Sequence, residues 1–315
     1  MKKPEVITSG EILVEIMRKG TKHSFLEPGI FLGPYPSGAP AIFISAVSRI
    51  SQKKVKAGIV SVVGVDDFGK MVVQRLKKDG VDTSMVRATT TTTGTAFVRY
   101  LTDGSRQFIF HPGAAGLLNP DDVKKDYFSS VKVFHITGSS LFISQSSFLA
   151  CKKALEISVE NKAIISFDPN IRKEMASFKE NISKINLFLK HTRILFTTEE
   201  EVFILFGKKS FKSIIEKLFK TGIEIIVVKK GAKGSEIYWQ DKKIIVPALK
   251  VKVVDPTGAG DTYAGAFVAC YCMDKKIEEC GKIASITASL KCTRQGPMSI
   301  PEYVEVEKYC RISYF

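Results

Sequence analysis

The sequence of 315 residues lacks any hydrophobic run of the length that a membrane helix needs, which is about 20 residues. Residues 1–10 also lack the apolar core of a secretory signal. Both absences argue against a membrane-spanning or secreted protein. We therefore expect the protein to work in the cytoplasm and to have no membrane partner.

Cysteine and histidine are scarce, and their spacing resembles neither a zinc site nor a disulfide framework. The four histidines are scattered, and no two cysteines form a C-x-x-C pair. We expect reduced, mostly buried thiols at Cys151, Cys270, Cys272, Cys280, Cys292 and Cys310.

The charge pattern lacks the basic stripe, interleaved with aromatic residues, that is typical of nucleic-acid binding. The 47 basic and 32 acidic side chains give a net charge of +15, but the lysines are spread along the chain. With 44% hydrophobic and 25% charged residues, the composition is that of a soluble globular protein. A solvated basic surface is therefore the better explanation, and we expect no nucleic-acid partner.

The chain also lacks an internal repeat and a low-complexity linker, so its length allows one large domain or one domain with a small appendage. Short β-branched runs alternate with helical patterns, as in βαβ units that build a mostly parallel sheet with both faces covered. We expect strands at 6–8, 57–62, 131–136, 163–167, 193–196 and 224–229. Helices are expected at 40–50, 68–79, 145–160, 182–191, 199–205, 211–219, 259–271 and 277–291.

Two segments, 11–31 and 95–111, interrupt this rhythm. In the second, two β-branched and aromatic runs flank a Thr102-Asp-Gly-Ser turn, which predicts a hairpin. Strands inserted in this way would form a small sheet that serves as a lid, and the threonine run 89–93 would be the hinge or loop that enters it. The exposed edges of such a sheet would also suit a homodimer that pairs through the lid.

The most informative segment is Val254-Asp-Pro-Thr-Gly-Ala-Gly-Asp-Thr-Tyr-Ala-Gly-Ala-Phe, between a β-branched run and a small-residue helix. Gly258 and Gly260 permit a tight turn, so that backbone N–H groups at the helix start converge on an anion. Asp261 then lies in the first helical turn. It could cap the helix, but a capping role needs neither two glycines nor a preceding Asp255. We favour a phosphoryl-transfer site with Asp261 as the base.

A second glycine-bounded segment, Gly64-Val-Asp-Asp-Phe-Gly-Lys70, imitates a Walker A loop. Met71 stands where a hydroxyl must reach Mg²⁺, and two aspartates would repel phosphate. We expect a strand-to-helix turn in which Asp66 or Asp67 caps the next helix.

The segment around Asp261 resembles the D-T-x-G-A-G-D signature of the ribokinase-like (PfkB) carbohydrate kinase superfamily. The resemblance runs along nearly the whole chain, through Gly10-Glu-Ile-Leu-Val-Glu15, Gly64–Gly69, Asp168-Pro-Asn-Ile-Arg172, Glu201, Gly231-Ala-Lys-Gly234 and Gly296. It implies a ribokinase-like three-layer α/β sandwich with a mostly parallel central sheet and a small β-sheet lid, in one kinase domain spanning residues 1–315. The branch it resembles most contains 2-keto-3-deoxygluconate, tagatose and fructose kinases.

The resemblance also implies roles for single residues. Asp261 resembles the catalytic base, Gly258, Ala259 and Gly260 resemble the anion hole, and Arg172 belongs to a D-x-N-x-R run near the phosphate path. Asp168 and Asn170 of that run would serve equally well as turn formers. The implied sugar-binding residues are Glu15, Ser37, Gly38, Ala39, Asp168, Asp261 and, on the lid, Phe97, Arg99 and Arg106. The three lid residues would be explained equally well as lid core or surface charge.

ATP and Mg²⁺ are the cofactors that the resemblance implies. The corresponding nucleotide-site residues are Asn170, Thr198, Lys229, Gly231, Gly234, Thr257, Gly258, Gly260, Ser289 and Thr293, with residues 291–296 forming an adenine-side loop. Glu201 would hold Mg²⁺ through water, unless it is one of three solvated glutamates. Asp255 and Thr257 match positions that border the ATP phosphates or a monovalent cation such as K⁺ in many members.

Three departures from the family pattern affect the expected site. Ile42 replaces a frequent sugar-binding Asn, Thr198 replaces the Asn of an N-x-x-E motif, and Lys229 replaces a common Thr. The sequence thus predicts an ATP-dependent sugar kinase, acting on a ketose or a sugar acid. The alternatives are a nucleoside kinase of the same superfamily and a sugar sensor without catalytic activity.

Overall fold

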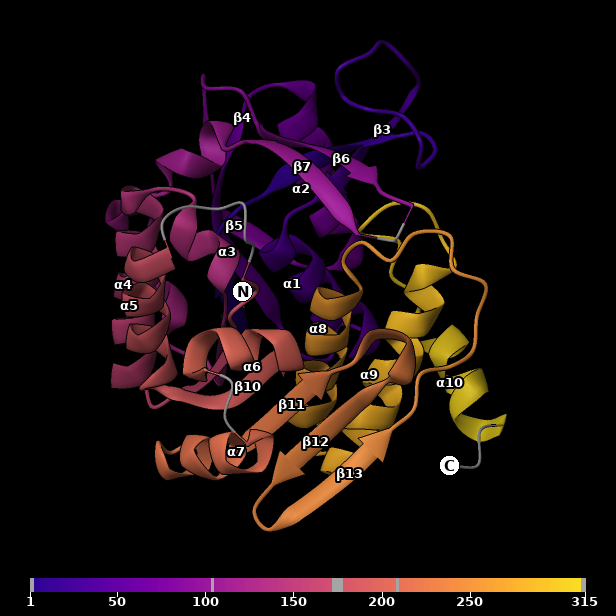
Figure 1. The fold of residues 1–315 in the computed structure, drawn as a ribbon. Helices are drawn as coiled ribbons and strands as arrows, with labels where there is room; N and C mark the ends of the chain where they lie inside the picture. Colours follow the sequence, from indigo (N-terminus) through magenta and orange to yellow (C-terminus); the bar gives the residue numbers. More distant parts are fainter. Residues whose placement is uncertain (1–2, 103–104, 172–177, 208–209, 313–315) are drawn as a thin grey trace.

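The computed structural model describes residues 3–102, 105–171, 178–207 and 210–312. They form a large sheet between two helical layers and a smaller sheet at one end (Figure 1). The helices are α1 (Ala39–Ile50), α2 (Asp67–Asp79), α3 (Gly138–Phe142), α4 (Gln145–Glu160), α5 (Phe178–Leu189), α6 (Glu199–Phe206), α7 (Phe211–Lys220), α8 (Ala259–Cys272), α9 (Ile277–Cys292) and α10 (Tyr303–Ile312). Short 3-10 helices lie at Gly113–Leu117, Pro120–Asp122, Lys125–Phe128 and Gly231–Lys233.

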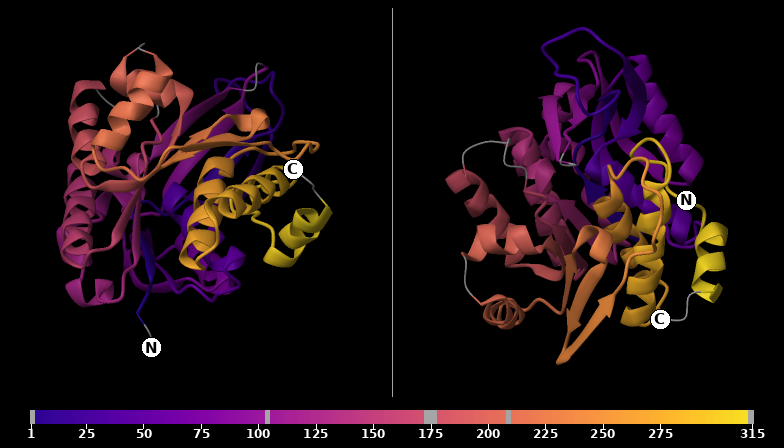
Figure 2. Two further views of the ribbon diagram at one scale, coloured as in Figure 1. Left: turned by 90° about the horizontal axis from the view of Figure 1, so that it is seen from below. Right: turned by 45° about the vertical axis from the view of Figure 1, so that its right-hand side comes forward.

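The large sheet has nine strands in the order β13-β12-β11-β10-β9-β8-β1-β4-β5. Its parallel strands are β1 (Val6–Ser9), β4 (Ala57–Gly64), β5 (Asp82–Thr89), β8 (Val133–Thr137), β9 (Ile164–Asp168), β10 (Thr192–Thr198) and β11 (Ile225–Lys229). An antiparallel hairpin, β12 (Ser235–Trp239) and β13 (Lys242–Val246), extends one edge. Figure 2 shows this hairpin at the end of the molecule opposite the smaller sheet.

Alternate residues of the central strands enter two separate cores, because successive side chains of a strand point to opposite faces. Val6 packs with α1, α8 and α9, whereas Ile7 packs with α4, α5 and α7. In the same way Val227 joins the first core and Val228 the second. The expected three-layer α/β sandwich is therefore confirmed.

The smaller sheet is the lid, with strand order β3-β2-β6-β7. Its strands are β2 (Leu13–Arg18), β3 (Phe31–Ser37), β6 (Gly94–Tyr100) and β7 (Arg106–His111). Both predicted segments supply strands, although β3 continues to Ser37, beyond the expected limit at Phe31. β6 and β7 pair antiparallel as expected, while the tip of their turn, 103–104, lies outside the described residues.

The loop that imitates Walker A is a strand-to-helix turn, as predicted. Asp66 caps α2 by accepting a hydrogen bond from Gly69 N at 2.8 Å. It also accepts bonds from the N–H and hydroxyl of Thr93, both at 2.7 Å, at the entrance to the lid. Burial alone would raise the pKa of Asp66, but these hydrogen bonds hold it below its ordinary value. The Asp66 carboxylate thus holds the segment that enters the lid, and the loop is not a phosphate-binding loop.

Most of the expected helices and strands are present, whereas strand β5, the β12–β13 hairpin, helices α3 and α10 and the 3-10 helices were not predicted. All six cysteines are free, and three of them are buried. None of the helices in the described ranges combines the length and the hydropathy that a bilayer-spanning segment needs.

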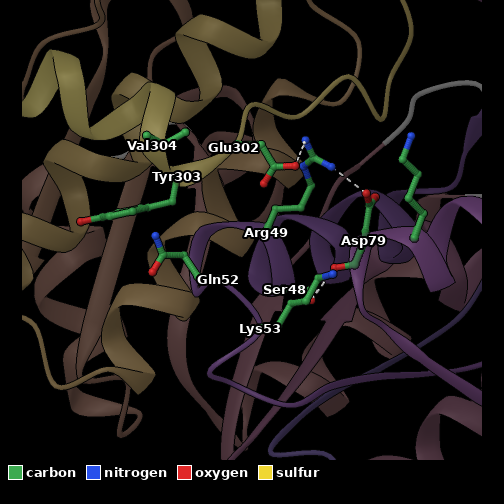
Figure 3. Close-up of a pocket in the computed structure, with 9 residues that line it drawn as sticks. Ser48, Arg49, Gln52, Lys53, Asp79, Glu302, Tyr303 and Val304 are labelled. Atoms are coloured by element: carbon green, nitrogen blue, oxygen red, sulfur yellow. Dashed lines mark hydrogen bonds and ion pairs between the residues drawn. The ribbon is translucent and has the colours of Figure 1, made fainter.

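A buried ion-pair network joins α1, α2 and the start of α10 (Figure 3). The Asp79 side chain has no exposed surface and accepts hydrogen bonds from Ser45, Arg49 and Arg75 at 2.7–2.8 Å. Arg49 also pairs with Glu302 at 2.8 Å. Arg49, Asp79 and Glu302 border a cavity of about 340 Å³ whose lining includes none of the predicted site residues, so we interpret the network as structural.

We predict that Asp79→Asn lowers the free energy of unfolding by about 3 kcal/mol, because two arginines lose their carboxylate in a buried site. Denaturant unfolding followed by circular dichroism measures the change. The matched control is Asp67→Asn on the same helix, whose exposed side chain forms an ion pair with Lys70 and should matter little. Equal losses in the two variants would contradict the assignment.

Candidate active site

A cavity of about 870 Å³ lies between the lid and the main sheet. Asn170, Thr198 and Lys229 reach it from the carboxyl ends of β9, β10 and β11, which is where open α/β sheets bind ligands. Most of the predicted site residues line it: Glu15, Ser37, Gly38, Ala39, Arg106, Asn170, Thr198, Glu201, Lys229, Gly231, Thr257, Gly258, Ala259, Gly260 and Asp261.

The start of α8 forms the floor of this cavity. Gly258 is the N-cap residue and has φ 76°, a left-handed conformation that favours glycine. A Cβ there would lie 2.9 Å from Ile42 and 3.0 Å from the Pro297 carbonyl. The turn therefore needs glycine, and it aims the first amides of α8 at the cavity. One of the predicted donors, Ala259 N, makes a turn bond to Pro256 O at 3.2 Å.

Asp261 lies in the first turn of α8 and lines the cavity. Asn170 Nδ2 donates a hydrogen bond to its Oδ1 at 3.3 Å. Asn170 has φ 41°, and its backbone N–H bonds the Asp168 carboxylate at 3.2 Å. Asp168 therefore acts as a turn former, and it does not line the cavity, whereas the turn presents Asn170 to Asp261. Arg172, from the same predicted run, lies outside the described residues.

Lys229 is a cation that lines the cavity beside the start of α8. Its ammonium group pairs with Asp168, and a Cβ on Gly260 would lie 3.4 Å from it. Burial would lower the pKa of Lys229, but the negative charges of Asp168, Glu201 and Asp261 raise it above its ordinary value. Lys229 therefore stays charged beside the start of α8.

Glu201 forms a capping box with Thr198 at the start of α6. Its carboxylate accepts bonds from Thr198 N at 2.8 Å and Ile171 N at 2.9 Å, and burial together with the Asp168 charge raises its pKa. Oε2 also accepts a bond from the Thr198 hydroxyl at 3.1 Å, whereas Oε1 accepts the Ile171 amide and keeps a lone pair for a water molecule. Glu201 lines the cavity and offers the carboxylate oxygen that Mg²⁺ prefers, so this residue fits a Mg²⁺ ion held through water.

Two buried glutamates, Glu11 and Glu15, line the cavity. Glu15 accepts a hydrogen bond from the Ser37 hydroxyl at 2.7 Å, so two of the residues that the resemblance implies for the sugar are in contact. Glu11, which the sequence reasoning did not single out as a site residue, accepts bonds from Ser139 and Ser140 at 2.7 and 2.6 Å and also lines the cavity. Its position directly after Gly10, at the start of the Gly10–Glu15 motif, was the available signal.

Two predicted lid contacts require correction. Glu15 is in register with Ala96, and both line the cavity, so the next residue, Phe97, points to the opposite face. Phe97 packs on the Phe31 ring, and Arg99 donates to His23 O at 3.2 Å. Of the three lid residues, Arg106 alone lines the cavity.

Four predicted nucleotide-site residues make other contacts. The hydroxyl groups of Ser289 and Thr293 donate hydrogen bonds to backbone carbonyls of α9. Gly234 packs against the backbone of Val246, because a Cβ on Gly234 would lie 2.0 Å from the Val246 carbonyl oxygen. None of the three lines the described cavity. Lys291, expected in the adenine-side loop, is fully buried and donates to Asp255 O.

The carboxylate of Asp255 is buried behind the anion-binding turn rather than in the cavity. Its Oδ1 accepts bonds from Thr257 N at 2.9 Å and from the Tyr100 hydroxyl at 2.6 Å. The same hydroxyl bonds Thr257 Oγ1. Tyr100, at the end of lid strand β6, was not predicted from the sequence, because no local pattern marks a contact over this distance along the chain.

Comparisons with known proteins agree with this geometry. Residues 34–302 match the pfkB family carbohydrate kinase. The chain is 32% identical to fructokinase-1 of Oryza sativa subsp. japonica and to fructokinase-1 of Zea mays, with 96% of each chain covered in both cases. An E. coli protein with the provisional name ribokinase II, solved with ATP and Mg²⁺, is 39% identical with a TM-score of 0.91, covering 98% of this chain and 100% of that one. The chain therefore belongs to the pfkB family and is a carbohydrate kinase.

Proposed function

We propose that the protein transfers the γ-phosphate of ATP to a hydroxyl group of fructose or a closely related ketose, with Asp261 as the general base. The observation that carries the proposal is the position of Asp261 in the first turn of α8, beside the amides of the anion-binding turn and inside a cavity under the lid. The fructokinase names of the relatives and the ATP and Mg²⁺ bound to the E. coli relative support it.

The proposed reaction is a direct displacement. The sugar hydroxyl loses its proton to the Asp261 carboxylate as its oxygen bonds to the γ-phosphorus. The bond to the bridging oxygen breaks, and ADP leaves with the electron pair. Asn170 holds the Asp261 carboxylate in place through the 3.3 Å bond. The amides at the start of α8 and the Lys229 ammonium face the oxygens that carry charge in the transition state.

Mg²⁺, when bound with ATP, would neutralise phosphate charge, and Glu201 is the residue that would hold it, through water. Lid closure over the sugar excludes water, which otherwise competes for the phosphoryl group. Two of the three departures from the family pattern fit this scheme. Lys229 adds a cation, and Ile42 gives an apolar wall beside Gly258.

The charges at the sugar end favour a neutral ketose over a sugar acid. Glu11 and Glu15 are buried there, and carboxylates accept hydrogen bonds from sugar hydroxyls but repel a substrate carboxylate. From the lid, the basic side chain of Arg106 lines the cavity. The positive net charge of the whole chain is therefore a poorer guide to substrate than the local pair of glutamates.

The experiment that tests the proposal is a coupled ADP-release assay with Mg·ATP and a panel of ketoses, aldoses, sugar acids and nucleosides. We expect fructose or a related ketose to have the highest kcat/KM. Preference for a nucleoside or a sugar acid would replace the proposed substrate class. Sugar binding, seen as a rise in Tm, without any turnover would indicate a sensor instead.

We predict that Asp261→Asn lowers kcat by about 10²–10⁴-fold, the usual contribution of a general base. ATP binding, measured by calorimetry, should be nearly unchanged, because the amides of the turn remain. The control is Asp274→Asn, an exposed aspartate just beyond the same helix. Near-normal turnover of the Asp261 variant would exclude it as the base.

We also predict that Lys229→Met lowers kcat by about 10²-fold, as expected for the loss of one preorganised group that stabilises transition-state charge. It should raise the KM for ATP as well, because Asp168 and Glu201 would then face the phosphates without their cation. Steady-state kinetics measure both. Lys233→Met, an exposed lysine of the neighbouring loop, is the control. Equal effects of the two would contradict a local role.

We also propose a domain organisation, a cellular location and an oligomeric state for the protein. The whole chain, 1–315, would act as one kinase unit in the cytoplasm. A homodimer through the lid is supported by exposed apolar residues on or near the lid face that points away from the cavity, Leu26, Ile30 and Ile109, and light scattering would reveal a monomer if it is wrong.

A further inference from the structure

Lys291 is a charged side chain with no exposed surface in the last turn of α9. Its ammonium nitrogen lies 2.8 Å from the backbone oxygen of Asp255 and 4.0 Å from the Asp255 carboxylate. A buried ammonium group is costly unless it is paired. The pairing therefore places one full positive charge directly behind the turn that carries the anion-binding amides.

The Asp255 carboxylate is already saturated with donors from the protein. Tyr100 and Thr257 N bond its Oδ1, while Gly296 N bonds its Oδ2 at 2.8 Å, with Gln295 at 3.4 Å. Burial would raise the pKa of Asp255, but the Lys291 charge and these hydrogen bonds hold it below its ordinary value. Burial lowers the pKa of Lys291, and Asp255 opposes that change.

These contacts bear on the monovalent cation that the sequence resemblance places at Asp255 and Thr257. A K⁺ ion needs several oxygens that are open to it, whereas the carboxylate of Asp255 and the hydroxyl of Thr257 are bonded to Tyr100 and to backbone amides. The Lys291 ammonium would also repel a second cation at this distance. The residues present therefore do not fit K⁺ beside Asp255.

We propose that the Lys291 ammonium is the built-in cation of the anion-binding turn, so that the enzyme needs no K⁺. Lys291 is a positioning residue: it holds the Asp255 backbone and carboxylate, and through them the Thr257–Gly260 turn, while supplying the charge that a bound ion would otherwise supply. This inference rests on the proposed function only in taking the turn as the phosphate site.

The first test uses the unmodified protein. Its Tm without substrates, and its kcat and KM for ATP, are compared in KCl and in tetramethylammonium chloride at the same ionic strength of about 0.1 M. We expect no K⁺-specific rise in Tm. We also expect kcat to change by less than about twofold, which corresponds to a small difference in activation free energy. A K⁺-specific rise in Tm, or activation of tenfold or more (about 1.4 kcal/mol), would overturn the proposal.

The second test compares two variants of Lys291, one that leaves a space where the ammonium group was and one that fills this space with an uncharged side chain. Lys291→Ala leaves room for an ion beside Asp255, and we expect kcat to fall by about tenfold or more and to recover partly in KCl, with a K⁺-specific rise in Tm. Lys291→Met loses the charge but fills the space, so it should lose activity without recovery. Lys282→Ala, on the same helix, should respond to K⁺ as the unmodified protein does.

The outcomes separate this inference from the proposed function. If no sugar is phosphorylated in any salt, the proposed function fails, whereas the Tm comparison still tests the cation. If Lys291→Ala and Lys291→Met lose activity equally and K⁺ rescues neither, Lys291 serves only the packing of α9, and the proposal is wrong. Should a variant fail to fold, the K⁺ response of the unmodified protein still decides the question.

Discussion

The active site depends on one buried carboxylate, that of Asp255. It joins three parts of the molecule: the end of α9 through Gly296 and Lys291, the turn before α8 through Thr257, and the lid through Tyr100. The turn before α8, whose residues line the cavity, is thus held from behind. The charge of a carboxylate is suited to the task, since one group accepts several donors at once and bonds to an ionised acceptor are stronger than neutral ones.

Much of the fold could be predicted because its signals are local. A β-branched run such as Ala57–Gly64 and a capping aspartate such as Asp66 determine where a strand and a helix begin and end. The missed elements have weaker patterns. β5 is only partly buried and carries polar residues, and the β12–β13 hairpin lies at the sheet edge, where one strand is largely exposed. Their existence follows from tertiary pairing with β4 and β11 rather than from their own residues.

The candidate site was predictable where a motif fixes the backbone, and less so where only side-chain direction matters. Gly258 and Asp261 follow from the turn that their own sequence requires. Phe97 and Ala96 are neighbours, yet only Ala96 faces the cavity, and the register that decides this is set by pairing with β2. Lys291 looked like a nucleotide-loop residue because motif position gives no information on burial. Its partner Asp255 lies far from it along the chain.

Lid strand β6 is tethered at both ends, since Thr93 is bonded to Asp66 just before it and Tyr100 to Asp255 at its last residue. Moving either end of this strand therefore breaks hydrogen bonds and costs free energy. Any swing that widens the sugar entrance by moving the Tyr100 end must first release the aspartate behind the phosphate turn. Movement of this end of the lid is thus coupled to the turn before α8, because Tyr100 and Thr257 share the Asp255 carboxylate.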